Sequence, residues 1–394
     1  MKTNLKKSLL FSLLLSLNLF ANEEIVIIQK DSLELKTKNT VLSVGGRVQL
    51  DTEYAWPKGI HSAKGIVLGE SVGESGHLNF TAKNSRLWVK TRTHSELGVV
   101  RALIETDFKG VEGTQTNTNS HGIRLRHAFV ELQNWGAGQT NSAFNADTTL
   151  DILLTAINDT LVRQPLIRYQ YDTTLFNYTI SFEQPESTLI DSSGVIITPQ
   201  DDVVPDIINR FIYYPKWGQL ALSVMGRYIN QDHAVLGDGI TQLNSRDSAF
   251  GYGANLSGKI KVFNLDDIRF ASHYGKGVGR YLAYNAYAAG SISDEGKITL
   301  QPSFGGDIGY RHFWNNKLRT TIAYSYAATK NNLDDIKLNL NKVNKSVHSS
   351  QINLIWTPIK NSLLGIEYAY AKRKVESGED GEIKMVNIMI RYDF

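Results

Sequence analysis

The sequence predicts an all-β protein, namely a transmembrane antiparallel β-barrel of about sixteen strands. Three observations lead to this fold class. Segment after segment alternates apolar and polar residues, which is the period of a strand with one apolar face and one wet face. Short turns alternate with long polar loops, as in outer-membrane barrels. No internal run approaches the ~18–20 apolar residues of a membrane-spanning helix.

The N-terminus has the layout of a secretory signal peptide. Lys2, Lys6 and Lys7 make it basic, and residues 8–20 are nearly all Leu, Phe and Ser. The small residue Ala21 is the predicted cleavage point. A single anchor helix is the alternative, but the apolar run is short for a membrane span. The segment predicts export, and we expect the barrel in a bacterial outer membrane.

We therefore divide the chain into three parts. Residues 1–21 are the signal peptide, residues 22–39 are a short periplasmic segment, either a short helix or a tail, and residues 40–394 are the barrel. Removing the signal peptide takes three Lys and no acid, which leaves 39 basic residues (42 − 3 = 39) against 39 acidic ones. This balance gives no reason to expect a nucleic-acid partner. The chain has no Cys, so a closed ladder of backbone hydrogen bonds is expected to hold the fold.

A repeating unit of strand, short turn, strand and long loop begins at Thr40. Roughly seven short turns and eight long loops alternate, so both termini are expected on the short-turn side, in the periplasm. Single-chain barrels of bacteria close with an even number of strands, and sixteen meets this condition. The expected strands lie at approximately 40–54, 83–94, 97–108, 122–132, 135–141, 165–172, 175–184, 205–214, 217–230, 247–260, 267–275, 298–312, 318–329, 347–357, 361–374 and 383–394.

The wall of such a barrel must turn its apolar residues to lipid. In the strand at 83–94, Leu87 and Val89 alternate with Arg86 and Lys90. A barrel of this size is too wide for side chains to fill, so its charged face borders water. Aromatic residues fall near both ends of the strands, as two membrane interfaces require. The alternative is a soluble sheet sandwich with ordinary strand aromatics.

The last strand, 383–394, carries a further signal. Alternate residues from Val386 to Phe394 form its apolar face. A terminal strand that ends on Phe resembles the assembly signal of outer-membrane barrels, and we assign that role to Tyr392 and Phe394. Pairing with the first strand, 40–54, would close the sheet and remove both of its edges.

The inward register is rich in arginine and predicts a water-filled lumen lined by positive charge. Such a lining concentrates anions, so an anion-preferring pore is the functional hypothesis. The alternative is that these arginines only pair with acids of the loops, whatever the pore transports. The predicted pore-lining residues are Arg47, Arg86, Lys90, Arg92, Arg101, Arg124, Arg126, Arg163 and Arg168, with Asp147, Asp151 and Asp159 on the third long loop.

The third long loop, 142–164, is expected to fold into the barrel. Its apolar residues include Leu150, Leu153 and Leu154, which would not stay in bulk water. Packing of these residues on the wall would narrow the lumen and set the loop opposite the arginines of the second to fourth strands. The alternative is a loop that contacts a neighbouring subunit.

Four segments resemble the DcaP-like trimeric porins: 44–51 (VGGRVQLD), 125–129 (LRHAF), 138–144 (GQTNSAF) and 162–169 (VRQPLIRY). Beyond residue 170 only the strand pattern is similar. The resemblance implies a sixteen-strand trimer that passes small anionic solutes, including dicarboxylates. Arg47, Arg126, Arg163 and Arg168 fall on its motifs. Founding members of that family carry a long N-terminal coiled coil, for which residues 22–39 are too short and irregular.

No chemistry beyond transport is indicated. The nine His form no metal-ligand spacing, and no cofactor is expected. We interpret the chain as an outer-membrane porin for passive diffusion of small hydrophilic solutes. Its expected partners are lipid, lipopolysaccharide, the barrel assembly machinery and two further copies of the chain. The alternative is a non-porin barrel, either an adhesin or a lipase or protease with its active site on the rim.

Overall fold

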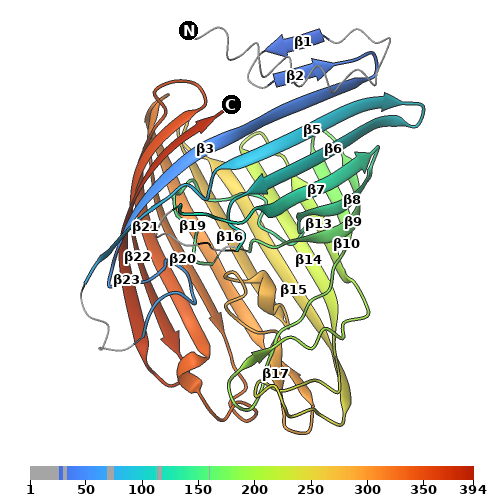
Figure 1. The fold of residues 1–394 in the computed structure, drawn as a ribbon, viewed down its shortest axis with the longest axis vertical. Helices are drawn as coiled ribbons and strands as arrows, with labels where there is room; N and C mark the ends of the chain where they lie inside the picture. Colours follow the sequence, from blue (N-terminus) through green and yellow to red (C-terminus); the bar gives the residue numbers. More distant parts are fainter. Residues whose placement is uncertain (1–25, 30–32, 69–74, 112, 114–117, 159) are drawn as a thin grey trace.

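The computed structural model describes residues 26–29, 33–68, 75–111, 113, 118–158 and 160–394. Sixteen antiparallel strands in this part of the chain form a closed barrel (Figure 1), which confirms the predicted fold class. The strands are β3 (Thr40–Trp56), β5 (Arg86–Ser95), β6 (Gly98–Asp107), β7 (Arg124–Leu132), β8 (Trp135–Asn141), β9 (Arg163–Asp172), β10 (Phe176–Glu183), β13 (Asp206–Tyr213), β14 (Gly218–Asp232), β15 (Arg246–Lys261), β16 (Asp267–Lys276), β19 (Pro302–Asn315), β20 (Leu318–Thr329), β21 (Asn344–Trp356), β22 (Ser362–Val375) and β23 (Asp380–Asp393).

The strands β23 and β3 form the seam of the barrel. Their antiparallel register ends with Asp393 opposite Arg47. One step further, the backbones of Phe394 and Gly46 each donate a hydrogen bond to the other, both at 2.9 Å. The predicted pairing of the last strand with the first is therefore confirmed.

The two faces of the wall follow the alternation in the sequence. In β14, Leu222 and Val224 are 47% and 44% exposed, whereas Ser223 and Met225 are 3% and 4% exposed. Large apolar side chains lie on the outer face of strand after strand in the same way. An apolar outer face suits lipid, and a polar inner face suits a wet interior.

The N-terminal segment differs from the prediction. Its described residues form a hairpin of β1 (Val26–Gln29) and β2 (Leu33–Lys36), not a helix, and β2 pairs with the start of β3. Because β3 continues past the end of β23, it would leave an unpaired edge there, which β2 covers. A further short strand, β4 (His77–Thr81), pairs with the other end of β3. The signal peptide and Ala21 lie outside the described residues.

Long loops fold together at the end of the barrel opposite the C-terminus (Figure 1). The fourth and sixth loops contribute a small sheet of β11 (Leu189–Ile190), β12 (Ile196–Ile197), β17 (Gly290–Ile292) and β18 (Ile298–Leu300). The strand that the sequence predicted from residue 298 is therefore two elements. Residues Ile298–Leu300 form β18 of this small sheet, and the wall strand β19 begins at Pro302.

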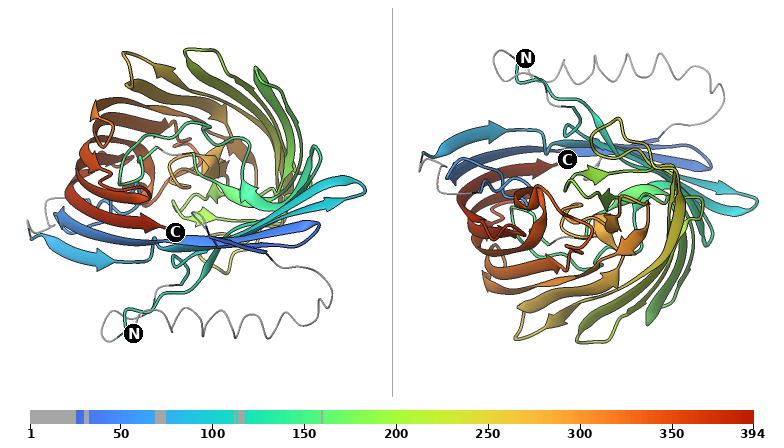
Figure 2. Two further views of the ribbon diagram at one scale, coloured as in Figure 1. Left: turned by 90° about the horizontal axis from the view of Figure 1, so that it is seen from above. Right: turned by 90° about the horizontal axis from the view of Figure 1, so that it is seen from below.

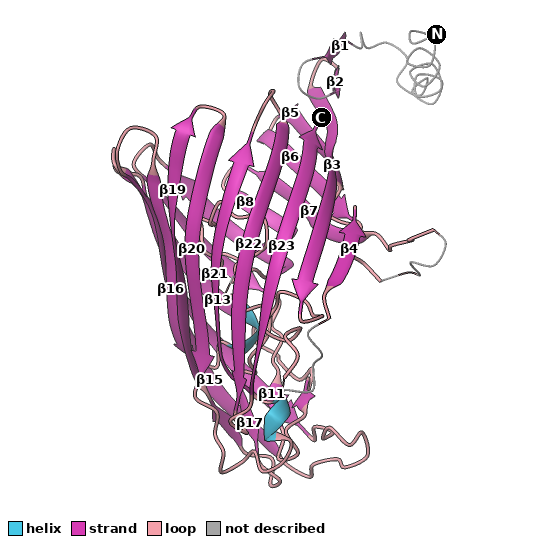
Figure 3. Cartoon of the chain, turned by 90° about the vertical axis from the view of Figure 1, so that its left-hand side faces the viewer, coloured by secondary structure: helices cyan, strands magenta, loops and turns pink. Residues whose placement is uncertain are grey.

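Two short 3-10 helices complete the described elements. They are η1 (Gly279–Tyr281), which lies inside the barrel, and η2 (Leu340–Lys342), which lies among the loops at its end (Figures 1 and 3). In the described part of the chain, no helix is long and apolar enough to cross a membrane.

Candidate functional site: the charged lumen

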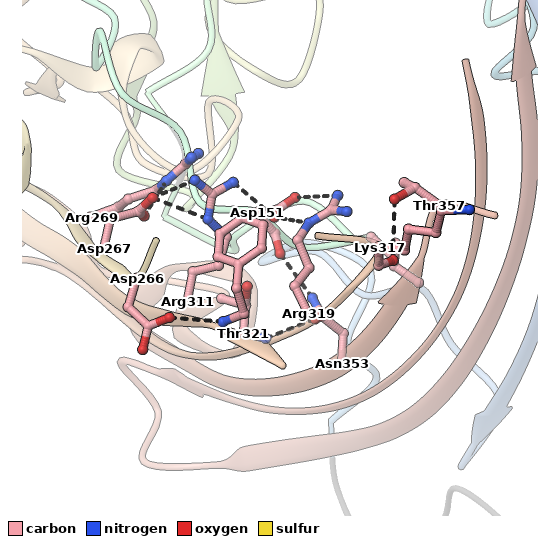
Figure 4. Close-up of polar contacts among 12 residues, drawn as sticks. Asp151, Asp266, Asp267, Arg269, Arg311, Lys317, Arg319, Thr321, Asn353 and Thr357 are labelled. Atoms are coloured by element: carbon pink, nitrogen blue, oxygen red, sulfur yellow. Dashed lines mark hydrogen bonds and ion pairs between the residues drawn. The ribbon is translucent and has the colours of Figure 1, made fainter. Parts of the chain in front are cut away.

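The third loop, residues 142–162 in the structure, lies inside the ring of strands (Figure 2), as predicted. Oδ2 of its Asp151 lies 2.6 Å from Arg319 Nε and 3.2 Å from Arg311 Nη1 (Figure 4). Asn353 donates a hydrogen bond to the backbone carbonyl of Asp151 at 2.9 Å. One loop residue is thus tied to β19, β20 and β21.

Asp147 provides a second anchor for the loop. Its Oδ1 lies 3.5 Å from Arg210 Nη1 of β13, and its backbone N–H donates to Ser257 Oγ of β15 at 3.1 Å. Gln219 of β14 donates a hydrogen bond to the same carboxylate. Both described acids of the loop therefore face the part of the wall on which the loop lies.

A carboxylate of the wall provides the third anchor. Glu367 of β22 accepts hydrogen bonds from the backbone N–H groups of Leu153 and Leu154, both at 2.8 Å. The apolar side chains of Phe144 and Ile157 are 0% and 2% exposed and pack in a cluster with wall residues. Burial of apolar loop residues drives the inward fold, and the polar anchors fix its position.

The pKa of Asp151 reflects its surroundings. Burial of the carboxyl group would raise the pKa, but the hydrogen bond from Arg319 and the charges of Arg319 and Arg311 lower it below its usual value of 3.8. Asp151 is therefore ionised at neutral pH, and its charge offsets part of the charge of the two arginines.

The arginines on the inner face of β13–β20 form ion pairs with nearby carboxylates. Each of five has a carboxylate within 3.5 Å, and these carboxylates come from the third loop or from the wall itself. The pairs are Arg210–Asp147, Arg227–Asp206, Arg269–Asp267, Arg311–Asp151 and Arg319–Asp151. Arg311 and Arg319 share Asp151, so the five arginines have four carboxylates and most, not all, of their charge is offset.

The opposite wall, made by β3 and β5–β9, holds a cluster of three arginines on two acids. Arg126 lies 2.6 Å from Glu105 and 2.9 Å from Asp107, and Arg124 lies 2.6 Å from Asp107. Arg86 lies 3.2 Å from Glu105. Three guanidinium groups share two carboxylates, so the cluster has a net charge of +1.

A β-bulge brings Arg126 into this cluster. The register of β6 and β7 shifts between the pairs Glu105–His127 and Thr106–Leu125, so Arg126 has no partner in the ladder. Bulges near functional sites commonly redirect a side chain. Arg126 is 7% exposed and bonds to the inward acids of β6.

Arg47 and Arg163 lie at the borders of the cluster. Arg47 is 3.9 Å from Asp393 across the seam. Arg163 begins β9, and its guanidinium lies within electrostatic range of Arg124 and Arg126. Arg163 forms no ion pair within the described residues, and its buried Nε has no hydrogen-bond partner there. A half-buried cation that has no ion pair in the described residues favours the approach of an anion.

The remaining predicted cations lie nearer the short turns. Arg92 stands opposite Arg101 in the register of β5 and β6. Neither of them, nor Lys90, has an ion-pair partner among the described residues. Arg168 pairs with Glu131 at 2.9 Å.

The structure thus separates the predicted site residues into two groups. The predicted cations belong to one wall, and Asp147 and Asp151 contact arginines of the other wall instead of Arg86 or Arg126. Asp159 lies outside the described residues. Tyr392 and Phe394, the predicted assembly signal, are 50% and 43% exposed.

Sequence reasoning missed Arg311 as a lumen residue. It lies near the end of the strand expected at 298–312, where the alternation is weakened by glycines at 305, 306 and 309. Its register opposite Asp267 reveals the inward position, and only the three-dimensional pairing supplies that information. No group of three or more His, Asp or Glu side chains in the described ranges is arranged to hold a metal ion.

A closed barrel with an apolar outer face, an inward third loop and a charged interior defines an outer-membrane porin. The chain belongs to the DcaP outer membrane protein family, which matches residues 15–176 and 224–394. The resemblance found in the first strands and the third loop is therefore confirmed. No curated protein matches the chain.

Solved structures share the fold. The outer membrane channel DcaP of Acinetobacter baumannii has a TM-score of 0.75 at 22% identity, over 90% of this chain and 98% of that chain. An anion-selective porin from Comamonas acidovorans has a TM-score of 0.56 at 13% identity, over 90% and 100%. OmpT of Vibrio cholerae has a TM-score of 0.56 at 10% identity, over 92% and 99%.

Proposed function

We propose that this porin passes small hydrophilic solutes by passive diffusion and favours anions, carboxylates included. Solutes move down their gradient between the arginine-rich wall of β3 and β5–β9 and the third loop, which narrows the lumen. No energy source and no chemical step take part.

Cations without an ion pair in the described residues, on the wall made by β3 and β5–β9, carry this proposal. The strands β3 and β5–β9 contain nine Lys and Arg and six Asp and Glu. Four of the nine cations, Lys90, Arg92, Arg101 and Arg163, have no ion pair in the described residues. The strands β13–β20 contain nine Lys and Arg and five Asp and Glu, and their five inward arginines share four carboxylates within 3.5 Å.

Charges in a narrow, water-filled lumen act strongly on ions because the walls have a low dielectric constant. Screening at physiological salt extends over about 8 Å. Cations of the arginine-rich wall would therefore raise the concentration of anions close to it.

The reversal potential in a KCl gradient across a planar bilayer tests the proposal. We expect a sign that corresponds to chloride permeating faster than potassium. A preference for potassium would overturn the anion preference and leave the porin fold intact.

A barrel without a continuous passage is the second candidate, as in an adhesin or a rim-sited lipase or protease. The small sheet of β11, β12, β17 and β18, which lies at the loop end, favours it. Conductance decides between the two, because a closed barrel would carry no ohmic current.

We further propose a homotrimer with both termini in the periplasm and with lipopolysaccharide around its loop end. The exposed apolar outer face requires either lipid or another barrel as its neighbour. Cross-linking in isolated outer membranes would give a species of three chains, and a monomer alone would contradict this assembly.

A further inference from the structure

The sixth loop, residues 277–301, enters the barrel as the third loop does, and its helix η1 lies inside the ring of strands (Figure 1). Tyr281 of this loop is 0% exposed, and Tyr287 is 2% exposed. Both belong to one apolar cluster with Ile208 of β13 and Val347 of β21. The loop therefore occupies the side of the lumen that borders these strands.

The hydroxyl of Tyr281 joins the sixth loop to the wall. It donates a hydrogen bond to Asp206 Oδ2 of β13 at 2.8 Å. Asp206 Oδ1 lies 3.2 Å from Arg227 Nε of β14, and both of these charged side chains are 0% exposed. Separation of the pair would leave a buried charge without a partner, which is costly. Asp206 is therefore a fixed acceptor for the sixth loop.

The same tyrosine contacts both ends of the third loop. Near the start of that loop, the ring of Phe144 meets the ring of Tyr281 edge to face, with the centroids 5.4 Å apart. Just past its end, Gln164 of β9 donates a hydrogen bond to the hydroxyl of Tyr281 at 2.9 Å. Tyr281 thus lies between the wall and both ends of the third loop.

Glu183 of β10 makes the contacts at the two ends depend on each other. Its carboxylate accepts hydrogen bonds from the backbone N–H of Ala143, at 2.8 Å, and from the side chain of Gln164. Glu183 and Gln164 are 1% and 3% exposed. A buried polar group that loses its partner is costly, so displacement of Tyr281 would disturb Gln164 and, through Glu183, the start of the third loop.

Tyr287 holds the sixth loop at a separate point. Its hydroxyl donates to the backbone carbonyl of Ala327 of β20 at 2.8 Å, which is its one hydrogen bond in the described part of the chain. That bond involves the wall and not the third loop. Tyr287 is therefore a matched control for Tyr281.

We propose that Tyr281 is a positioning residue that couples the sixth loop to the third, so that the two loops narrow the lumen as one unit. The effect on passage rests on the proposed function. The coupling itself rests on the contacts of Tyr281 alone, so the two can be tested separately.

Labelling of introduced cysteines tests the coupling, because the chain has no Cys of its own. Ala143 of the third loop and Ala286 of the sixth are each 2% exposed, so Ala143→Cys and Ala286→Cys should react slowly with a charged, water-soluble maleimide. Tyr281→Phe keeps the ring and removes both hydrogen bonds of the hydroxyl. It is expected to raise the labelling rate at both positions by about tenfold, as for the loss of one buried hydrogen bond to a charged group.

Tyr287→Phe is the control for this experiment. It removes one hydrogen bond from the same loop and is expected to raise the labelling rate at Ala286→Cys alone. An unchanged rate at Ala143→Cys in the Tyr281→Phe background would overturn the coupling. Faster labelling at both positions in Tyr287→Phe would also overturn the special role of Tyr281, because any loosening of the sixth loop would then reach the third.

Single-channel conductance tests the effect on passage. Tyr281→Ala is expected to increase the conductance, because it frees the sixth loop from the wall and from the third loop, while the barrel keeps its heat-modifiable electrophoretic mobility. Tyr281→Phe, which keeps the ring contact with Phe144, should give an intermediate value. A conductance that none of these changes alters would overturn the role of Tyr281 in the passage. Absence of any current in the unmodified protein would overturn the proposed function and leave the coupling of the loops intact.

Discussion

Arg319 Nε lies 2.6 Å from Asp151 Oδ2, so a side chain of β20 holds the middle of the third loop. Arg311 contacts the same carboxylate at 3.2 Å. The contact of Asp151 with these two arginines has two effects. It fixes the position of the loop, and the carboxylate offsets part of the positive charge of the wall behind it. Both effects can be measured through one substitution.

Asp151→Asn is expected to loosen the third loop and to strengthen the anion preference. The amide cannot offset the charges of Arg311 and Arg319, and loss of a charge-assisted contact costs about 1.5–3 kcal/mol. Single-channel recording would show larger current fluctuations, and the reversal potential would move toward that of chloride. Asp238→Asn, on the exposed fifth loop, is the matched control and should change neither. An unchanged reversal potential in Asp151→Asn would show that this wall does not contribute to selectivity.

The contact of Asp151 with Arg311 and Arg319 should be lost only under strongly acidic conditions. The pKa of Asp151 is lowered below 3.8 when the loop is docked, through the net effect of burial and of the bonds and charges of Arg319 and Arg311. A lowered pKa stabilises the docked loop at pH values above 3.8, and this contribution is lost as the pH falls through the lowered value. Current fluctuations should therefore stay constant from neutral pH down to 3.8 and increase below it. An increase that is complete well above that pH would assign the loosening to another group.

Charge reversal should matter more on the arginine-rich wall than near the loop end. Arg86 belongs to the cluster on Glu105 and Asp107, whereas Arg373 donates to the carbonyl of Ile66 in the first loop. Arg86→Glu changes two charges at a distance of roughly 10 Å from a passing ion. This distance corresponds to about a fourfold change for each ion in water, in opposite directions, and so to about a 16-fold loss of the chloride-to-potassium permeability ratio. Arg373→Glu is expected to have the smaller effect, and equal shifts would move the narrow part of the passage away from the cluster.

The terminal aromatic residue should affect assembly more than stability. Phe394 is 43% exposed, and its backbone forms the two hydrogen bonds with Gly46 that close the seam. Phe394→Ala should therefore reduce the amount of barrel in the outer membrane, while the protein refolded in detergent keeps its heat-modifiable electrophoretic mobility. Phe304→Ala, also on the outer face and 45% exposed, should leave the amount in the membrane unchanged. Equal losses for both variants would assign the effect to lost lipid contact.

The fold was accessible from the sequence because the barrel repeats one local pattern. The strand at 135–141 has the predicted bounds, and so does the strand at 318–329. The hairpin of β1 and β2 was missed, since its charged residues lack a clear two-residue period. Its strands form because β3 offers an edge, and an edge is a property of the whole sheet.

The site was accessible only in part. Apolar residues of the third loop predicted that it folds inward, yet they could not show which wall it would contact. Asp147 and Asp151 find their partners more than sixty residues away in sequence, on β13, β19 and β20. The sixth loop gave no apolar signal of comparable strength, because its buried residues are mostly alanine, glycine and tyrosine. Its entry into the barrel depends on hydrogen bonds of the tyrosines.

The unequal length of the wall strands has a consequence for how the membrane surrounds the barrel. β14 has 15 residues and β8 has 7. At about 3.3 Å per residue, β8 spans about 23 Å even before tilt, less than the ~25 Å of an apolar barrel band. Hydrophobic mismatch would therefore thin the bilayer on one side of the barrel only. A neighbouring barrel on that side would relieve the mismatch, so we expect the low wall of β6–β9 to form the subunit contact, with Ile104 and Ile167 of its outer face in the interface.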